Sequence, residues 1–205
     1  MTPISEISAE KIHTVWSNVV KAITEMGFNI VATTTDGHKS NMKFFKTLLC
    51  KGKWKSHIPN PFQDGKKIFL LFDTTHLLKN IYHNFRNKET FICPPFNFGL
   101  DDSPSKFNIH PNFAHVRQLQ DIEIGHPVKI AHKLNDKVLN PRSLEKTNVR
   151  LADALFHERT INGLEYYSKN GFPHFQHTAN FLRIIRNWWD TCNVKSKLTE
   201  LCIFN

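Results

Sequence analysis

The sequence of 205 residues has few cysteines and no long apolar run, and both shortages restrict the class of protein. Cys50, Cys93, Cys192 and Cys202 stand far apart, so there is no Cys-x-x-Cys pair and no Cys/His spacing typical of structural zinc. We therefore expect a reduced, intracellular compartment. No stretch approaches the length needed to span a bilayer, and residues 1–10 lack the pattern of a signal peptide. We expect a soluble cytoplasmic or nuclear protein with no membrane partner.

Glycine-rich phosphate loops of the Gly-x-x-x-x-Gly-Lys-Ser/Thr kind are also missing, which disfavours a P-loop GTPase. What the chain does have is positive charge and aromatic side chains. It carries 27 Lys and Arg against 18 Asp and Glu, a net charge of +9, together with 17 Phe and 4 Trp. This content supports one moderate domain or two small ones. The charge favours a polyanionic partner such as DNA, although RNA or an acidic protein would also satisfy it.

Two segments share one pattern, a β-type apolar run that ends at an acidic residue and continues into a helical segment. The first run, residues 29–35, ends at Asp36-Gly37, and the second, residues 68–72, ends at Asp73. A helix over residues 8–26 precedes them, with one buried stripe predicted from Ile12, Val15, Trp16, Val19, Ile23 and Met26. A second helix is predicted over residues 41–49. This alternation is typical of a parallel sheet.

From residue 94 to 110 the composition changes to Pro, Asn, Asp, Ser and Phe without periodicity, which indicates a connection. Beyond it the pattern is helical, with predicted helices at residues 112–123, 141–169 and 177–192. The fold class is therefore α/β plus α. We predict an α/β domain over residues 1–93, a connection over 94–110 and a helical domain over 111–205.

Several motifs resemble those of one transposase family. They are Asp36-Gly37 with Asn41, Asp73-x-x-His76-Leu77-Leu78-Lys79-Asn80, Asn84-x-Arg86-Asn87, Lys146-Thr147-Asn148-Val149 and Trp189-Asp190-x-x-Asn193. In this order they resemble the P-element family of cut-and-paste DNA transposases, which includes the THAP-domain transposases. The likeness extends from about residue 8 to residue 194.

This resemblance implies an incomplete ribonuclease-H-like sheet followed by a helical GTP-binding insertion domain that is incomplete at its C-terminal end. In that fold, carboxylates at the ends of adjacent strands share two divalent ions roughly 4 Å apart. By topology, Asp36 takes the position of the second acid, and is our catalytic and Mg²⁺-binding candidate. The family's first Asp and final Glu are expected outside this chain, so we expect the chain alone to be inactive in DNA cleavage. An open sheet edge would also favour self-association or marginal stability.

Each acidic residue also has a purely structural interpretation. Asp36-Gly37 suits an ordinary turn after a strand. Asp73 precedes a helix, where an Asp that accepts backbone N–H bonds contributes about 1 kcal/mol as an N-cap. Asp73 and His76 are therefore candidates for supporting residues beside the site. A second possibility for Asp73, that it is itself an acidic ligand, stays open.

The resemblance also implies the nucleotide contacts Lys146, Val149, His157, Trp189, Asp190 and Asn193. Asp190 would accept the N1–H and N2–H groups of guanine, an edge that adenine lacks, and the indole of Trp189 would stack on the purine. Lys146 suits a phosphate, and His157 stands where the family has a serine. The alternative for Trp188 and Trp189 is helix core, with at most one of the two rings facing inward.

The basic residues Lys79, His83, Arg86 and Lys88 are candidates for contact with a DNA backbone, or else belong to a solvated helix face. The resemblance implies GTP and transposon DNA as partners and a nuclear location. A second function class stays open, in which the chain is a domesticated or relic interaction module and the same residues serve only packing.

Overall fold

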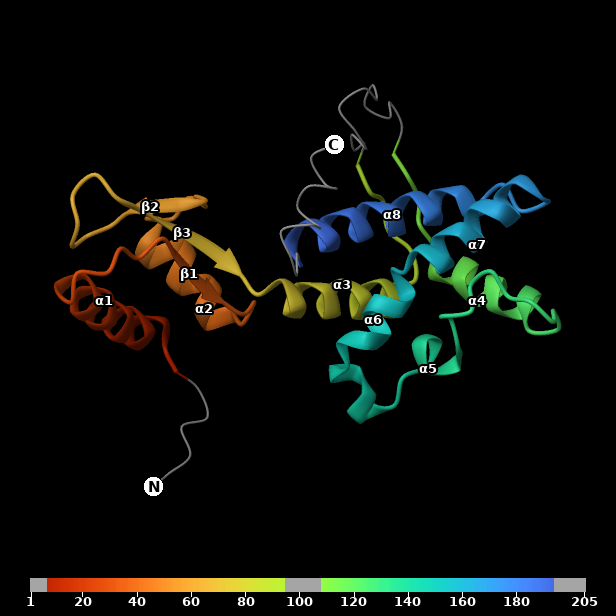
Figure 1. Ribbon diagram of the computed structural model, residues 1–205, viewed down its shortest axis with the longest axis horizontal. Coiled ribbons are helices and arrows are strands. Elements are labelled where there is room, and N and C mark those ends of the chain that lie inside the picture. Colours follow the sequence, from red (N-terminus) through yellow and green to blue (C-terminus); the bar gives the residue numbers. More distant parts are fainter. Residues whose placement is uncertain (1–6, 95–107, 194–205) are drawn as a thin grey trace. The chain divides into compact units, whose positions relative to one another are not determined.

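The computed structural model describes residues 7–94 and 108–193 of the 205-residue chain. The chain forms two compact units, Met1–Leu77 and Leu78–Asn205, each with its own hydrophobic core (Figure 1). The division falls inside a helix, and most of the predicted connection at 94–110 lies outside the described residues. The predicted domain limits therefore stay a prediction. None of the described helices is long and apolar enough to cross a membrane.

The first unit is a small α/β structure. Its elements are α1 (Ala9–Glu25), β1 (Ala32–Thr35), α2 (Lys39–Lys43), the π-helix η1 (Phe44–Leu49), β2 (His57–Pro59) and β3 (Lys67–Phe72). The strand order is β1-β3-β2, with β1 parallel to β3 and β2 antiparallel to it. The predicted parallel pairing is confirmed. The sequence pattern did not predict β2, a three-residue strand at the sheet edge that ends at Pro59, a residue that cannot donate to a ladder.

The core of the first unit lies on one face of the sheet. Ile68 and Leu70 of β3 are buried there with Phe44 and Phe45 of η1. Helix α1 contributes a narrower stripe than predicted, in which Ala9 and Val20 are buried and Ile12 and Trp16 are half-buried. The remaining predicted stripe residues include three that are exposed, namely Val15 (55%), Val19 (49%) and Met26 (73%). The broad stripe was wrong because the helix packs along the line of residues 9, 12, 16 and 20.

The second unit is helical. Its elements are the α3 helix (Thr74–Lys88), which begins at the end of the first unit, α4 (Phe113–Glu123), α5 (Asp136–Leu139), the 3-10 helix η2 (Ser143–Thr147), α6 (Val149–Leu155), α7 (Glu158–Lys169) and α8 (Phe175–Cys192). The long helix predicted from residue 141 to 169 was wrong. The side chains of Asn148 and His157 accept the N–H groups of Arg150 and Arg159, and so start two separate helices. Leu144, within the range of that predicted helix, is 91% exposed.

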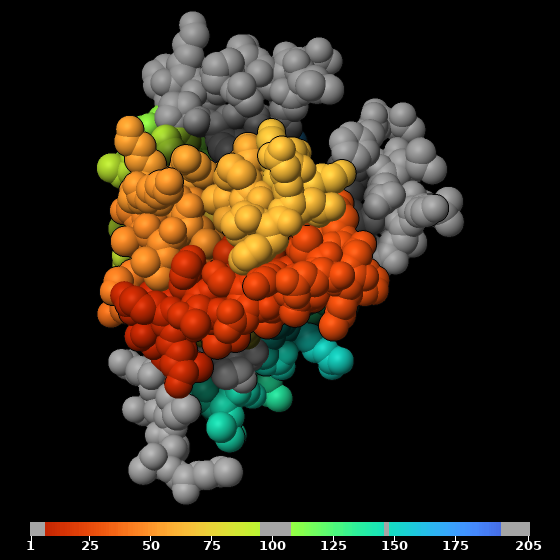
Figure 2. All heavy atoms as spheres, turned by 90° about the vertical axis from the view of Figure 1, so that its left-hand side faces the viewer, coloured from red at the N-terminus to blue at the C-terminus, as the bar shows by residue number. Residues whose placement is uncertain are grey.

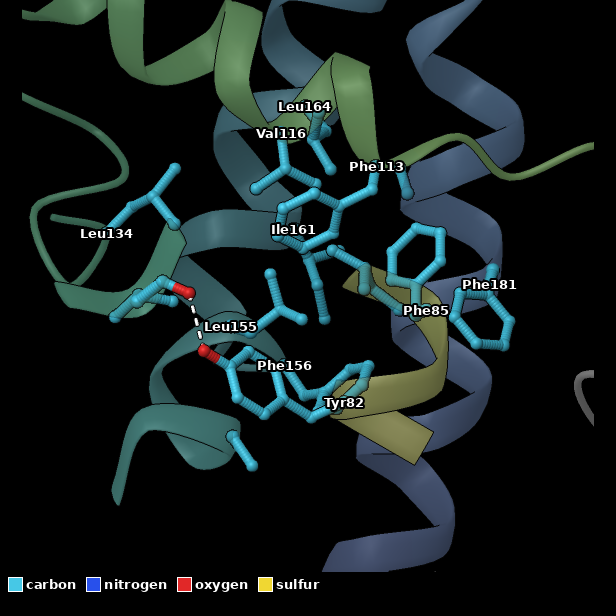
Figure 3. Close-up of a cluster of buried hydrophobic side chains, with 14 of the residues drawn as sticks. Tyr82, Phe85, Phe113, Val116, Leu134, Leu155, Phe156, Ile161, Leu164 and Phe181 are labelled. Atoms are coloured by element: carbon cyan, nitrogen blue, oxygen red, sulfur yellow. Dashed lines mark hydrogen bonds between the residues drawn. The ribbon is translucent and has the colours of Figure 1, made fainter. Parts of the chain in front are cut away.

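Helices α7 and α8 pack against each other, and α3 adds buried aromatic side chains to their core (Figure 3). Phe85 of α3 meets Phe113 and Phe181 edge to face, with ring centroids 5.4 and 5.0 Å away. Tyr82, 1% exposed, donates its hydroxyl to the backbone oxygen of Val138 at 2.6 Å. Burial raises the pKa of Tyr82 to about 12. One hydroxyl thus satisfies a carbonyl inside an otherwise apolar core.

Candidate functional site

Two acidic residues lie at one edge of the small sheet. Asp36 follows β1 and Asp73 follows β3, and the last residues of these parallel strands, Thr35 and Phe72, are paired. The backbone N–H of Asp73 donates to the Thr35 oxygen at 2.7 Å. Because parallel neighbours end at the same edge of a sheet, both acidic residues lie along that edge.

The Asp36 carboxylate is held in its ionised form. Its Oδ1 accepts the backbone N–H of His38 and the Nδ2 amide of Asn41, both at 2.8 Å. The His38 bond, then the Asn41 bond, lower the pKa of Asp36, and the charge of His76 adds to the shift. Both hydrogen bonds use Oδ1, and Oδ2 accepts none from the described residues. The residue therefore shapes a turn with one oxygen and offers the other for a ligand.

Asp73 caps the helix that follows it. Its Oδ1 accepts the N–H groups of Thr75 at 2.8 Å and His76 at 3.3 Å, and its Oδ2 lies 3.9 Å from His76 Nε2. These contacts suit a supporting role for Asp73 and His76 beside Asp36. Among the residues that the structure describes, no three His, Cys, Asp or Glu side chains are grouped to hold a metal ion.

The basic residues proposed on α3 differ in their surroundings. Lys79 is half-buried and Lys88 is exposed. Arg86 donates to Asn87 Oδ1 at 3.0 Å, while its Nε is buried without a partner among the described residues. They do not form one uniformly exposed row.

In the second unit, an arginine joins helices α6 and α8 around Asp190. Arg186 Nε donates to Asp190 Oδ2 at 2.8 Å, and its NH1 donates to Asp153 Oδ1 at 3.1 Å. The Arg186 side chain is 19% exposed, against 47% for Asp190 and 44% for Asp153. The arginine is thus largely enclosed, and the carboxylate that it holds faces outward.

His157, at the start of α7, belongs to the same neighbourhood. Burial lowers its pKa, and the positive charges of Arg186, Lys133 and His132 lower it further, against the opposing charge of Asp153. The charges that act on this imidazole thus come from α6, from α8 and from the segment before α5.

The other predicted nucleotide contacts differ in their surroundings. Trp189 is 7% exposed in the core, and Trp188 is half-buried beside it, with ring centroids 6.4 Å apart. Asn193 is exposed just after α8, and Val149 begins α6 half-buried. Lys146 lies in η2, and its side chain is outside the described part of the structure.

Arg186 and Asp153 were not among the predicted site residues. A signal for Arg186 was present, because a cation four residues before an acid on a helix forms an i,i+4 pair. Asp153 carried no comparable signal, since it reaches Arg186 only through the packing of α6 near α8.

The fold and these sites define a class, a small α/β unit with a mixed sheet and acids at the sheet edge, joined to a helical unit. The sequence profile of a family described as TNP-like, GTP-binding insertion domain matches residues 99–202. The Transposable element P transposase of Drosophila melanogaster is 27% identical over 193 residues, which cover 91% of this chain and 23% of that protein. Human DNA transposase THAP9 is 24% identical over 180 residues, covering 85% and 18%.

A solved structure, the Drosophila P element transposase strand transfer complex, has the same fold, with a TM-score of 0.73 and 22% identity. The match covers 93% of this chain and 39% of that one. The chain belongs to the P-element family of transposases and contains that family's insertion domain. It spans about a quarter or less of the length of the Drosophila and human transposases that it matches.

Proposed function

We propose that this chain binds a guanosine nucleotide through its insertion domain and takes part in holding transposon DNA. The observation that carries the proposal is the Asp190 carboxylate, a predicted contact that Arg186 holds at 2.8 Å while its side chain stays 47% exposed. The family description and the names of the two relatives support GTP and DNA as the partners. The alternative of a packing-only relic is not favoured by these matches.

Asp190 fits the role of guanine reader. A carboxylate oxygen has two lone pairs, so Arg186 can hold Oδ2 while both oxygens still accept donors from solvent or a base. Guanine presents two adjacent N–H donors, and adenine does not. The half-exposed carboxylate therefore selects guanine, and the exposed Lys133, whose charge acts on His157, favours a phosphorylated ligand.

Trp189 fits the role of stacking partner less well, because its ring is 7% exposed and packs in the core. Stacking on this ring requires it to turn outward when the nucleotide binds. Lys146, Val149 and Asn193 stay proposed contacts.

For the first unit, we infer that Asp36 is one carboxylate of a divalent-metal site, with Mg²⁺ as the expected ion. The open Oδ2 of Asp36 suits this role, and Asp73 and His76 would support the edge. Further acids from outside the described residues would complete the site, and the ions would then stabilise the attacking and leaving oxygens of a phosphodiester. Without them, the chain is expected not to cut DNA. We also propose that the chain is nuclear and that it self-associates.

The test is a titration of purified protein with fluorescent GTP, competed with GTP, ATP and XTP. Wild type should prefer GTP to ATP. Asp190→Asn should shift the preference toward XTP, because its amide can donate to the xanthine C2 carbonyl. Asp153→Asn is the matched control, since it also removes a partner of Arg186 but leaves the base-reading carboxylate. Equal competition by GTP and ATP in wild type would refute the proposal.

A further inference from the structure

Positive charge is concentrated in one short segment of the first unit. Between residues 51 and 67 there are five lysines and a single aspartate, Asp64, giving +4 of the net charge of +9. This segment contains β2, the start of β3 and the loop between them. Figure 2 shows the surface at this end of the unit, with the segment in orange to yellow. Almost half of the net positive charge therefore lies in this hairpin and the residues just before it.

The hairpin lines an open surface cavity of about 480 Å³. Lys55, Lys66 and Lys67 line it together with His57, and Asp64 is the one acid in the lining. Lys55 precedes β2 by two residues, whereas Lys67 opens β3 opposite Pro59 at the other end of β2. The lysines therefore approach the cavity from both ends of the short strand.

No acid in the described part of the chain neutralises these lysines. Lys55, Lys66 and Lys67 are exposed, and none of them makes an ion pair with the described residues. Lys43 of the same unit differs, because its Nζ lies 2.7 Å from Glu10 Oε1. A cluster of unpaired ammonium groups beside a cavity creates a positive potential that favours an anion.

The backbone that carries these charges is fixed. The N–H of Asn60 donates to the Lys66 oxygen at 2.8 Å, and its Oδ1 accepts the N–H of Phe62 at 3.0 Å. Asn60 is 6% exposed, so this turn is anchored inside the unit. A fixed loop lowers the conformational entropy that binding would otherwise cost.

We propose that this hairpin cavity binds the phosphodiester backbone of duplex DNA. This proposal rests on the proposed function, which has DNA as a partner. It adds a DNA-binding site other than the candidate basic residues of α3. Lysine supplies point charges that position phosphates without reading bases. The lining has no Phe, Tyr or Trp side chain of the kind that anchors protein interfaces, which favours a nucleic acid over an acidic protein.

The experiment measures binding of a fluorescent DNA duplex by anisotropy at several salt concentrations between about 50 and 200 mM. In wild type, log K should fall linearly with log salt. The triple variant Lys55→Gln, Lys66→Gln, Lys67→Gln should reduce that slope by about 2 to 3, because each phosphate contact contributes about 0.9. Circular dichroism confirms that the variant is folded.

The control variant Lys11→Gln, Lys21→Gln, Lys46→Gln removes the same charge from exposed positions elsewhere in the unit. It should change the slope by less than about 1. An equal reduction in both variants, or no binding by wild type at low salt, overturns the proposal. So does displacement of the duplex by polyglutamate or inorganic phosphate at the same charge concentration.

Guanosine binding is measured on the same samples and separates the two proposals. The hairpin variant should keep the GTP preference of wild type. If wild type binds no GTP but the hairpin variant still shows a reduced salt slope, nucleotide binding is refuted and the DNA-binding hairpin is supported. Retained GTP preference with an unchanged salt slope would refute only the hairpin site.

Discussion

Glu123 allows a sharp test of how the helical unit holds the loop that leads to His132 and Lys133. This carboxylate is 2% exposed, at the end of α4. Its Oε1 accepts the N–H of Ile130 at 3.1 Å, and its Oε2 accepts the N–H of Ala131 at 3.0 Å. Each oxygen thus serves one backbone donor. In Glu123→Gln one oxygen becomes an NH₂ group, which points a donor at another donor.

The size of the effect follows from these two bonds. Hydrogen bonds to charged groups contribute about 1.5–3 kcal/mol each, and a buried donor left without a partner costs about 1–3 kcal/mol. Glu123→Gln loses one bond and weakens the other, so we expect the free energy of unfolding to fall by about 3 kcal/mol. Urea unfolding at neutral pH measures this through the transition midpoint.

The matched control is Asp121→Asn, an exposed acid two residues earlier on α4. It should change stability by less than about 0.5 kcal/mol. If Glu123→Gln cost no more than the control, the carboxylate would not be holding the loop and the reasoning would fail.

Three further changes test other parts of the structure. Tyr82→Phe leaves a buried carbonyl unpaired and should cost about 1–3 kcal/mol, seen as a lower urea midpoint. Gly163→Ala adds a methyl 3.2 Å from Ala131 Cβ. Overpacking should cost about 1–3 kcal/mol, which exceeds the gain of about 1 kcal/mol from the higher helix propensity of Ala, so Tm should fall. An unchanged or higher Tm would refute the close contact. Asn41→Ala should raise the pKa of Asp36 toward its ordinary value, as followed by carboxyl-carbon NMR. Folding lowers the pKa of Asp36, so its ionised carboxylate stabilises the fold fully above a pH of about 3.9, the ordinary pKa of an Asp. This stabilisation is lost as the pH falls through the lowered pKa of the folded state. Asn41→Ala should therefore lose less stability than wild type on acidification.

Local signals in the sequence predicted several elements well. Ser8 and Asn112 are N-caps whose side chains accept N–H groups of the first helical turn, and α1 and α4 begin directly after them. Two apolar runs became the parallel strands β1 and β3, so the sheet edge with Asp36 and Asp73 was predictable. These features depend on residues close together in the chain.

Features that depend on packing were predicted poorly. The apolar residues Val15 and Val19 fit a helical stripe by spacing but are exposed, because tertiary contacts choose which side of α1 is covered. Trp189 lies in the core although its family motif pointed to a ligand. The spacing of apolar residues does not distinguish a core side chain from a binding one.

The helix break at His157 also determines how the candidate nucleotide site is assembled. Periodicity alone predicted one helix from residue 141 to 169, which would have kept Asp153 and His157 on a single straight rod. Because His157 caps a new helix, α6 ends at Leu155 and α7 begins at Glu158. Asp153 then contacts Arg186 on α8. The positive charge of Arg186 also lowers the pKa of His157. Asp153, the second partner of the arginine that holds Asp190, therefore lies on a short helix whose end the sequence pattern concealed.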